Sequence, residues 1–160
     1  MIVPSRLERL AEQSRSEVSE VYPMTELRYD VIPMDIDGVL HDLDNSGRFV
    51  GHWITPEGVM RAIQVTSERV TELGTLGGSA SSARGLNRAG AIVGGSLTEH
   101  DTAHHAFLYE DGVMHDVNAL IAPEAVCELI QALAINDRGD IVAIGHLRGV
   151  DRVVLLKRRD

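Results

Sequence analysis

The sequence of 160 residues contains a single cysteine, Cys127, and aromatic residues make up only 4% of it. One cysteine excludes an internal disulfide, and we expect its thiol to be buried and unreactive. No run of about 18 apolar residues occurs, so a membrane-spanning helix is not expected. The formal net charge is −9, and the only dense basic run is residues 157–159. Nucleic-acid binding, which needs clustered Lys and Arg, is therefore not expected.

The first residues also lack an apolar stretch of signal-peptide length before charged residues begin. This absence predicts a cytoplasmic protein, and an extracellular location stays open if the sequence is a fragment. Ser5 and Glu8 form a capping box after Pro4, so residues 1–22 are predicted to be a separate helical segment. Its apolar stripe is narrow, and we expect the helix to dock on its own sheet or on another chain.

Glycine is abundant, with 15 residues, and one short phrase occurs three times. The phrase is an apolar residue, Asp or Asn, two further residues, Gly and an apolar run. The Asp or Asn and the Gly of the three copies are, in order, Asp44 with Gly47, Asn87 with Gly90, and Asn136 with Gly139. The glycines are 43 (90 − 47) and 49 (139 − 90) residues apart, the period of a four-stranded repeat. Because glycine suits tight turns between short strands, we predict an all-β repeat domain over residues 23–160.

The predicted repeat units cover about residues 35–78, 79–121 and 122–160, each with short antiparallel strands. The third unit ends after its third strand, and residues 27–34 could complete it. Closed propellers need about four to eight blades. Three blade-like units therefore predict either two chains that assemble six blades or a smaller closed arrangement.

Several phrases resemble the bacterial HAF repeat, named for its His-Ala-Phe triplet. The triplet is His105-Ala106-Phe107, and residues 73–79 and 85–90 also match. The resemblance covers roughly residues 27–157. It implies propeller-like repeats in proteins that are usually extracellular or uncharacterised, and it implies no established reaction. The first unit departs from the pattern, because residues 61–63 are Arg-Ala-Ile.

The densest group of potential metal ligands is the segment His-Asp-Thr-Ala-His-His at residues 100–105. Imidazole and carboxylate bind zinc or another divalent metal, so His100, Asp101 and His104 could form a metal site. Histidines of other units that could converge with them are His41, His52 and His146. We prefer the alternative that His105 is structural and that His100 and His104 lie in solvent.

The repeated turns also invite a calcium interpretation, because residues 42–47 carry oxygen side chains on alternate positions before Gly47. A calcium loop needs Glu at its twelfth position, which here is Trp53. The other two copies lose the acids, so we interpret the Asp and Asn as turn residues that bond the backbone. Residues 74–80 lack the Lys of a phosphate loop and are interpreted as a connection between strands.

Together these patterns predict a non-enzymatic β-repeat module that binds a protein or a ligand and self-assembles, without a cofactor. The predicted assembly is a homo-oligomer, for example a dimer with six blades. Two alternatives stay open. One is a metal-dependent hydrolase that uses the His/Asp group, and the other is an acidic neutralising or accessory subunit that contacts a basic protein.

Overall fold

The computed structural model describes residues 36–122, 125 and 127–159. The chain divides into residues 1–35 and 36–160, and the fold described here is that of the second unit. The predicted N-terminal helix and the segment 27–34 lie outside the described residues.

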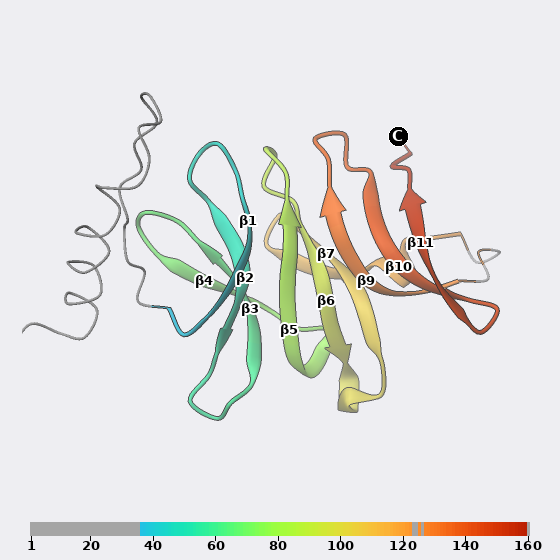
Figure 1. Ribbon diagram of the computed structural model, residues 1–160, viewed down its shortest axis with the longest axis horizontal. Helices are drawn as coiled ribbons and strands as arrows, with labels where there is room; N and C mark the ends of the chain where they lie inside the picture. The colour runs from blue at the N-terminus through green and yellow to red at the C-terminus, as the bar shows by residue number, and fades with distance from the viewer. Residues whose placement is uncertain (1–35, 123–124, 126, 160) are drawn as a thin grey trace, which may run out of the picture. The chain divides into compact units, whose positions relative to one another are not determined.

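The described chain forms three antiparallel sheets that follow one another along the sequence (Figure 1). The first sheet contains β1 (Gly38–Leu43), β2 (Phe49–Ile54), β3 (Met60–Val65) and β4 (Val70–Gly74). The second contains β5 (Gly77–Leu86), β6 (Ile92–Thr98), β7 (His104–Glu110) and β8 (Val113–Asp116). The third contains β9 (Glu128–Ile135), β10 (Ile141–Leu147) and β11 (Val150–Leu156). The short helical turns are η1 (Glu99–Asp101) and η2 (Val117–Ala119). The all-β prediction, with two four-stranded units and a third of three strands, is confirmed, whereas closure into a propeller stays a prediction.

Each repeated phrase forms the turn between the first two strands of its sheet. In the first turn, the amide of Gly47 donates to the carbonyl of Asp44 at 3.1 Å, and Gly90 and Gly139 make the same bond in their turns. The three glycines have φ of +78°, +95° and +83°, a left-handed conformation that residues with a Cβ rarely adopt. The phrase recurs because each sheet needs one such turn.

The sheets pack face to face in chain order. We call the face that carries Val50, Val93 or Val142 the forward face of its sheet, and the opposite face the back face. The forward face of the first sheet packs on the back face of the second, in a core that includes Val50 and Phe107. The forward face of the second packs on the back face of the third, in a core that includes Val93 and Ile141. Strands β5 and β9 make most of these contacts with the preceding sheet.

One local expectation differs from the structure. Strand β5 already begins at Gly77, so only Thr75 and Leu76 connect it to β4. The predicted connection over residues 74–80 was therefore too long, because its second half pairs with β6 around a register shift.

Candidate functional site

The three predicted metal ligands lie near one another in sequence but have different partners. Asp101 accepts a hydrogen bond from the amide of Ser79 at 2.6 Å. His100 is exposed, and its Nδ1 is 3.9 Å from a Glu99 carboxylate oxygen. Within residues 36–122, 125 and 127–159, no group of three or more His, Cys, Asp or Glu side chains is placed to hold a metal. The metal site stays a prediction.

His104 and His105 link the second sheet to the third. The Nδ1 of His104 donates to the carbonyl of Ile130 at 2.8 Å, because a carbonyl can only accept. His105 Nδ1 lies 2.7 Å from an Asp116 carboxylate oxygen, and its Nε2 lies 3.4 Å from Glu128 of β9. The histidine of the His-Ala-Phe triplet thus contacts its own sheet and the next one. His104, predicted to lie in solvent, is exposed as a residue, but its Nδ1 is hydrogen-bonded.

A second histidine group, which the sequence analysis did not assemble, lies between the first two sheets. The rings of His41 and His52 have centroids 5.4 Å apart. His52 Nδ1 is 3.0 Å from Ser82 Oγ, and a guanidinium nitrogen of Arg84 is 3.5 Å from His41 Nδ1. Burial first, and then the positive charge of Arg84, lowers the pKa of both imidazoles below 6.5. The neutral rings are thus part of the packing between the first two sheets.

The repeated turns are joined to one another by hydrogen bonds. Arg48 donates to the carbonyls of Asn87 and Arg88 at 3.2 and 3.1 Å. The side-chain amide of Asn87 donates to the carbonyl of Asn136 at 3.1 Å, and the Arg88 amide donates to Asp137 at 3.0 Å. Within its own turn, Asp44 accepts from the amides of residues 46 and 48. Its partial burial opposes ionisation, but hydrogen bonds from Ser46 and Arg48 hold its pKa well below the ordinary range. The turns therefore tie the sheets together at one end.

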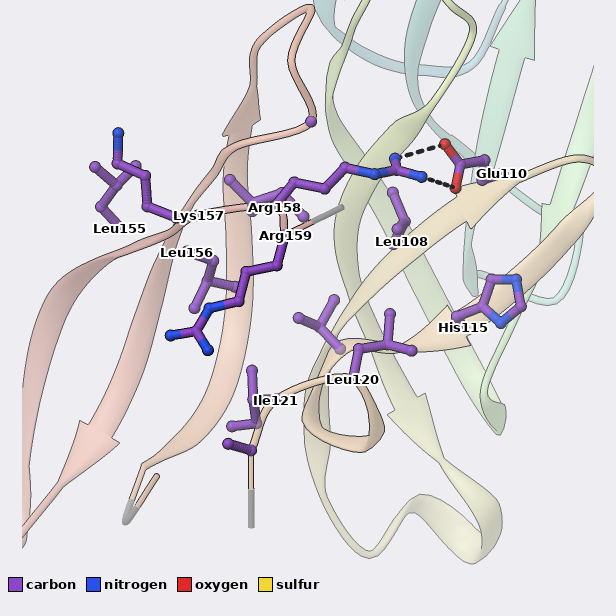
Figure 2. A pocket seen from close by; sticks show the side chains of 14 residues that line it. Leu108, Glu110, His115, Leu120, Ile121, Leu155, Leu156, Lys157, Arg158 and Arg159 are labelled. Atoms are coloured by element: carbon purple, nitrogen blue, oxygen red, sulfur yellow. Dashed lines mark hydrogen bonds and ion pairs between the residues drawn. The ribbon is translucent and has the colours of Figure 1, made fainter. Parts of the chain in front are cut away.

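A groove of about 920 Å³ lies between the outer strands of the second and third sheets. Its apolar lining is Leu108, Val117, Leu120, Ile121, Ile141, Leu155 and Leu156. Leu120, with an exposed fraction of 57%, lies at its open side. The C-terminal residues Lys157, Arg158 and Arg159 line the same groove (Figure 2).

The cations of the groove differ in their partners. Arg158 forms two hydrogen bonds with the Glu110 carboxylate, at 2.9 and 3.3 Å, which Figure 2 shows as dashed lines. This contact with Arg158 lowers the pKa of Glu110, against a smaller opposing effect of burial. Lys157 lies 4.0 Å from Asp140. Among the described residues, no ion pair involves Arg159, which is exposed. Arg159 therefore supplies a cation next to apolar side chains.

This groove could not be predicted from the sequence, because its lining comes from four separated segments. The only sequence signal was the basic run at residues 157–159, which gives no indication of an apolar partner surface. In the part of the chain that the structure describes, no helix has the length and apolarity to cross a membrane.

Comparisons of the chain with protein-family models, with curated proteins and with solved structures give no match. The resemblance to the HAF repeat therefore stays a prediction.

Proposed function

We propose that this chain is a non-enzymatic β-repeat module that acts by binding, and that the groove between the second and third sheets is its ligand site. The observation that carries the proposal is the groove itself, about 920 Å³ of space with an apolar lining and three neighbouring cationic side chains. Ligand sites in proteins are typically concave and mostly apolar, with a few polar groups that set orientation.

The groove favours a ligand with an apolar body and one anionic group. The apolar body would cover Leu120 and Ile121, whose burial is favourable because it removes apolar surface from water. The anionic group would meet Arg159, on a protein whose formal net charge of −9 otherwise repels anions. Arg159 would therefore favour an anionic group at this groove.

Two fluorescent probes test this preference. Anilinonaphthalene sulfonate is anionic, and N-phenyl-1-naphthylamine has the same ring systems without the sulfonate. We expect Arg159→Gln to weaken binding of the sulfonate about fivefold, because one charge-assisted contact of about 1 kcal/mol is lost. Binding of the neutral probe should be unchanged. Leu120→Asp should weaken both probes.

Matched controls lie on the first sheet, away from the groove. Arg69→Gln removes an exposed cation, and Val70→Asp places a carboxylate on a side chain with an exposed fraction of 53%, close to the 57% of Leu120. Neither should change the affinity of either probe. Equal effects of control and groove variants, or no effect of Leu120→Asp, would overturn the groove as the binding site.

A further inference from the structure

The third sheet has one strand fewer than the other two. In the first and second sheets, the third strand pairs with an antiparallel fourth strand, β4 or β8. Strand β11 is the third strand of its own sheet and pairs with β10 along one edge. Among residues 36–122, 125 and 127–159, no strand pairs with its other edge. Unpaired N–H and C=O groups on the edge of a sheet can bond a further strand.

Strand pairing shows which part of β11 corresponds to the part of β7 that holds β8. The valine that lies six residues after the Asn of its turn (93 − 87 and 142 − 136) pairs with Leu108 in the second sheet and with Leu155 in the third. Positions of β7 therefore correspond to positions of β11 that lie 47 residues later (155 − 108). Strand β8 pairs with residues 107–110, so the equivalent place in the third sheet lies beside residues 154–157.

The interface between the first two sheets shows what a fourth strand does there. Leu73 of β4 belongs to the core of that interface, and Leu76 and Met114 pack against this core. Met114 is a residue of β8, which also contacts β4. The fourth strand of the second sheet thus brings an apolar side chain to the end of the fourth strand before it.

The groove is the same place one interface later. Val117 and Leu120 lie 44 residues after Leu73 and Leu76 (117 − 73 and 120 − 76), the same spacing as between the paired positions 65 and 109 (109 − 65). Both line the groove, and Leu156 lines it from the third sheet (Figure 2). Leu76 is partly buried, whereas Leu120 has an exposed fraction of 57%. The difference arises because no described strand stands beside β11 in the position that β8 has beside β7.

We infer that the ligand of the groove is an extended peptide of a partner protein, which adds to β11 as the fourth strand of the third sheet. The inference rests on the proposed function, because it names the class of ligand for the same groove. The peptide runs antiparallel to β11 beside residues 154–157, as β8 does beside β7. When a peptide adds to the edge of a sheet, main-chain hydrogen bonds supply affinity and alternate side chains supply specificity.

The first side chain that the repeat specifies is apolar. Met114 pairs with Tyr109, and the residue of β11 that corresponds to Tyr109 is Leu156 (109 + 47). An aliphatic residue of the peptide opposite Leu156 therefore takes the place of Met114 and covers Leu120. Covering Leu120 is favourable because it removes apolar surface from water.

The second specified side chain is acidic and lies two residues further along. The fourth strands carry Glu72 and Asp116 at this position, and Asp116 lies 2.7 Å from His105 of the third strand. The residue of the first sheet that corresponds to His105 is Arg61 (105 − 44), and that of the third sheet is Arg152 (105 + 47). Arg152 is exposed and has no ion pair among the described residues. The preferred peptide therefore has an aliphatic residue followed two positions later by Asp or Glu.

The β11 strand of a second copy is the alternative occupant of this edge. Within Val150–Leu156, no aliphatic residue is followed two positions later by Asp or Glu. The one acid of the strand, Asp151, is already 2.8 Å from His146. A second β11 would therefore bring like charges to Arg152 and no free carboxylate, so a peptide from another protein fits the edge better.

A peptide that copies residues 112–118 of this chain is the probe, because it contains the fourth-strand pattern. Fluorescence anisotropy of the labelled peptide with the full chain should show saturable binding, and the peptide should displace the naphthalene probes. Met114→Asp in the peptide should weaken binding about tenfold or more, because a carboxylate would enter an apolar site. Leu120→Asp in the chain should also weaken it.

A charge reversal at Arg152 tests the register. Arg152→Glu should weaken the peptide about tenfold, because an attraction becomes a repulsion. The same peptide with Asp116→Lys should bind the wild-type chain weakly and regain its affinity for Arg152→Glu. A peptide that displaced β8 from the second sheet would lie beside His105 and would not respond to Arg152, and this outcome would overturn the inference.

The matched control is Arg69→Glu, a charge reversal at an exposed position of the first sheet, which should leave peptide binding unchanged. Arg152→Glu should keep its circular dichroism spectrum and its affinity for the naphthalene probes, because Arg152 does not line the groove. Peptide that fails to bind, while the probes respond to Leu120→Asp, would overturn the inference and leave the proposed function standing. Probes that ignore Leu120→Asp would overturn the proposed function itself. Sedimentation that shows a dimer of the chain which the peptide dissociates would assign the edge to a second copy and would also overturn the inference.

Discussion

The second and third sheets are two copies of the same repeat unit, and they differ in what covers their faces. The second sheet is covered on both faces, and its core position at the centre of β6 and β7 pairs Gly94 with Phe107. The third sheet pairs Ala143 with Val154 at the same place and is covered on its back face. A small residue opposite a large one in the second sheet thus corresponds to two residues of intermediate size in the third.

Gly94 lies where the surrounding structure leaves no room for a side chain. A Cβ at this position would first meet the backbone carbonyl oxygen of Ser82 in β5, and it would also lie 2.8 Å from Phe107 Cε1; both approaches are closer than real Cβ contacts. The backbone of β5 therefore requires glycine at this position, and the first sheet likewise has Gly51 opposite Ile63, with the carbonyl oxygen of Val39 as the nearest obstacle.

The two sheets should differ most in stability when the side chain of Phe107, or its equivalent in the third sheet, is removed. Phe107→Ala should lower the free energy of unfolding by about 3–5 kcal/mol, because it leaves a cavity in a fully buried core. Val154→Ala, at the equivalent but half-buried position, should cost about 1 kcal/mol. Urea unfolding of both variants measures the two losses in the free energy of unfolding. Equal losses would show that the two sheets contribute equally to the stability of the fold.

Local features of this fold could be predicted from the sequence, and contacts between sheets could not. The turn at Asp44 and the strands around it follow from residues within a few positions of one another. The bond between His52 and Ser82 joins residues 30 positions apart, and that between Asn87 and Asn136 joins residues 49 apart. Such contacts depend on how one sheet stacks on the next, which neither periodicity nor turn chemistry specifies.

The histidine loop illustrates the same limit. His100, Asp101 and His104 are close in sequence, which suggested that they could act together. A strand and a turn direct neighbouring side chains to different places. Asp101 accepts a hydrogen bond from the Ser79 amide, whereas His104 donates one to the Ile130 carbonyl. The groove shows the converse, since Leu108, Leu120 and Leu156 come together from separate segments.

A smaller effect on stability is expected from the hydrogen bonds between the repeated turns. Asn87→Asp keeps the oxygen that accepts from the Ala91 amide but removes the amide that donates to the Asn136 carbonyl. We expect a loss of about 1–3 kcal/mol in the free energy of unfolding, because a carboxylate at this buried position cannot donate and faces the Asn136 carbonyl. Asn87→Ser, a neutral variant, should cost less. If Asn87→Asp is as stable as the wild type, the turns do not stabilise the stack.

The contact between the first and second sheets should respond to pH through His41 and His52. Both have a folded-state pKa below the ordinary value of 6.5, so the unfolded chain binds more protons as the pH falls below 6.5. The stability that the neutral rings contribute is complete above pH 6.5 and is lost as the pH falls through the folded-state values. Charging His41 is unfavourable because its buried Nε2 has no hydrogen-bond partner among the described residues.

The free energy of unfolding, measured with urea at pH 8 and at pH 5, should differ less between the two pH values for His52→Gln than for the wild type. His100→Gln, which changes an exposed imidazole, is the control and should keep the wild-type pH dependence. If both variants keep it, the acid sensitivity arises elsewhere, and the histidine group between the first two sheets is only a packing feature.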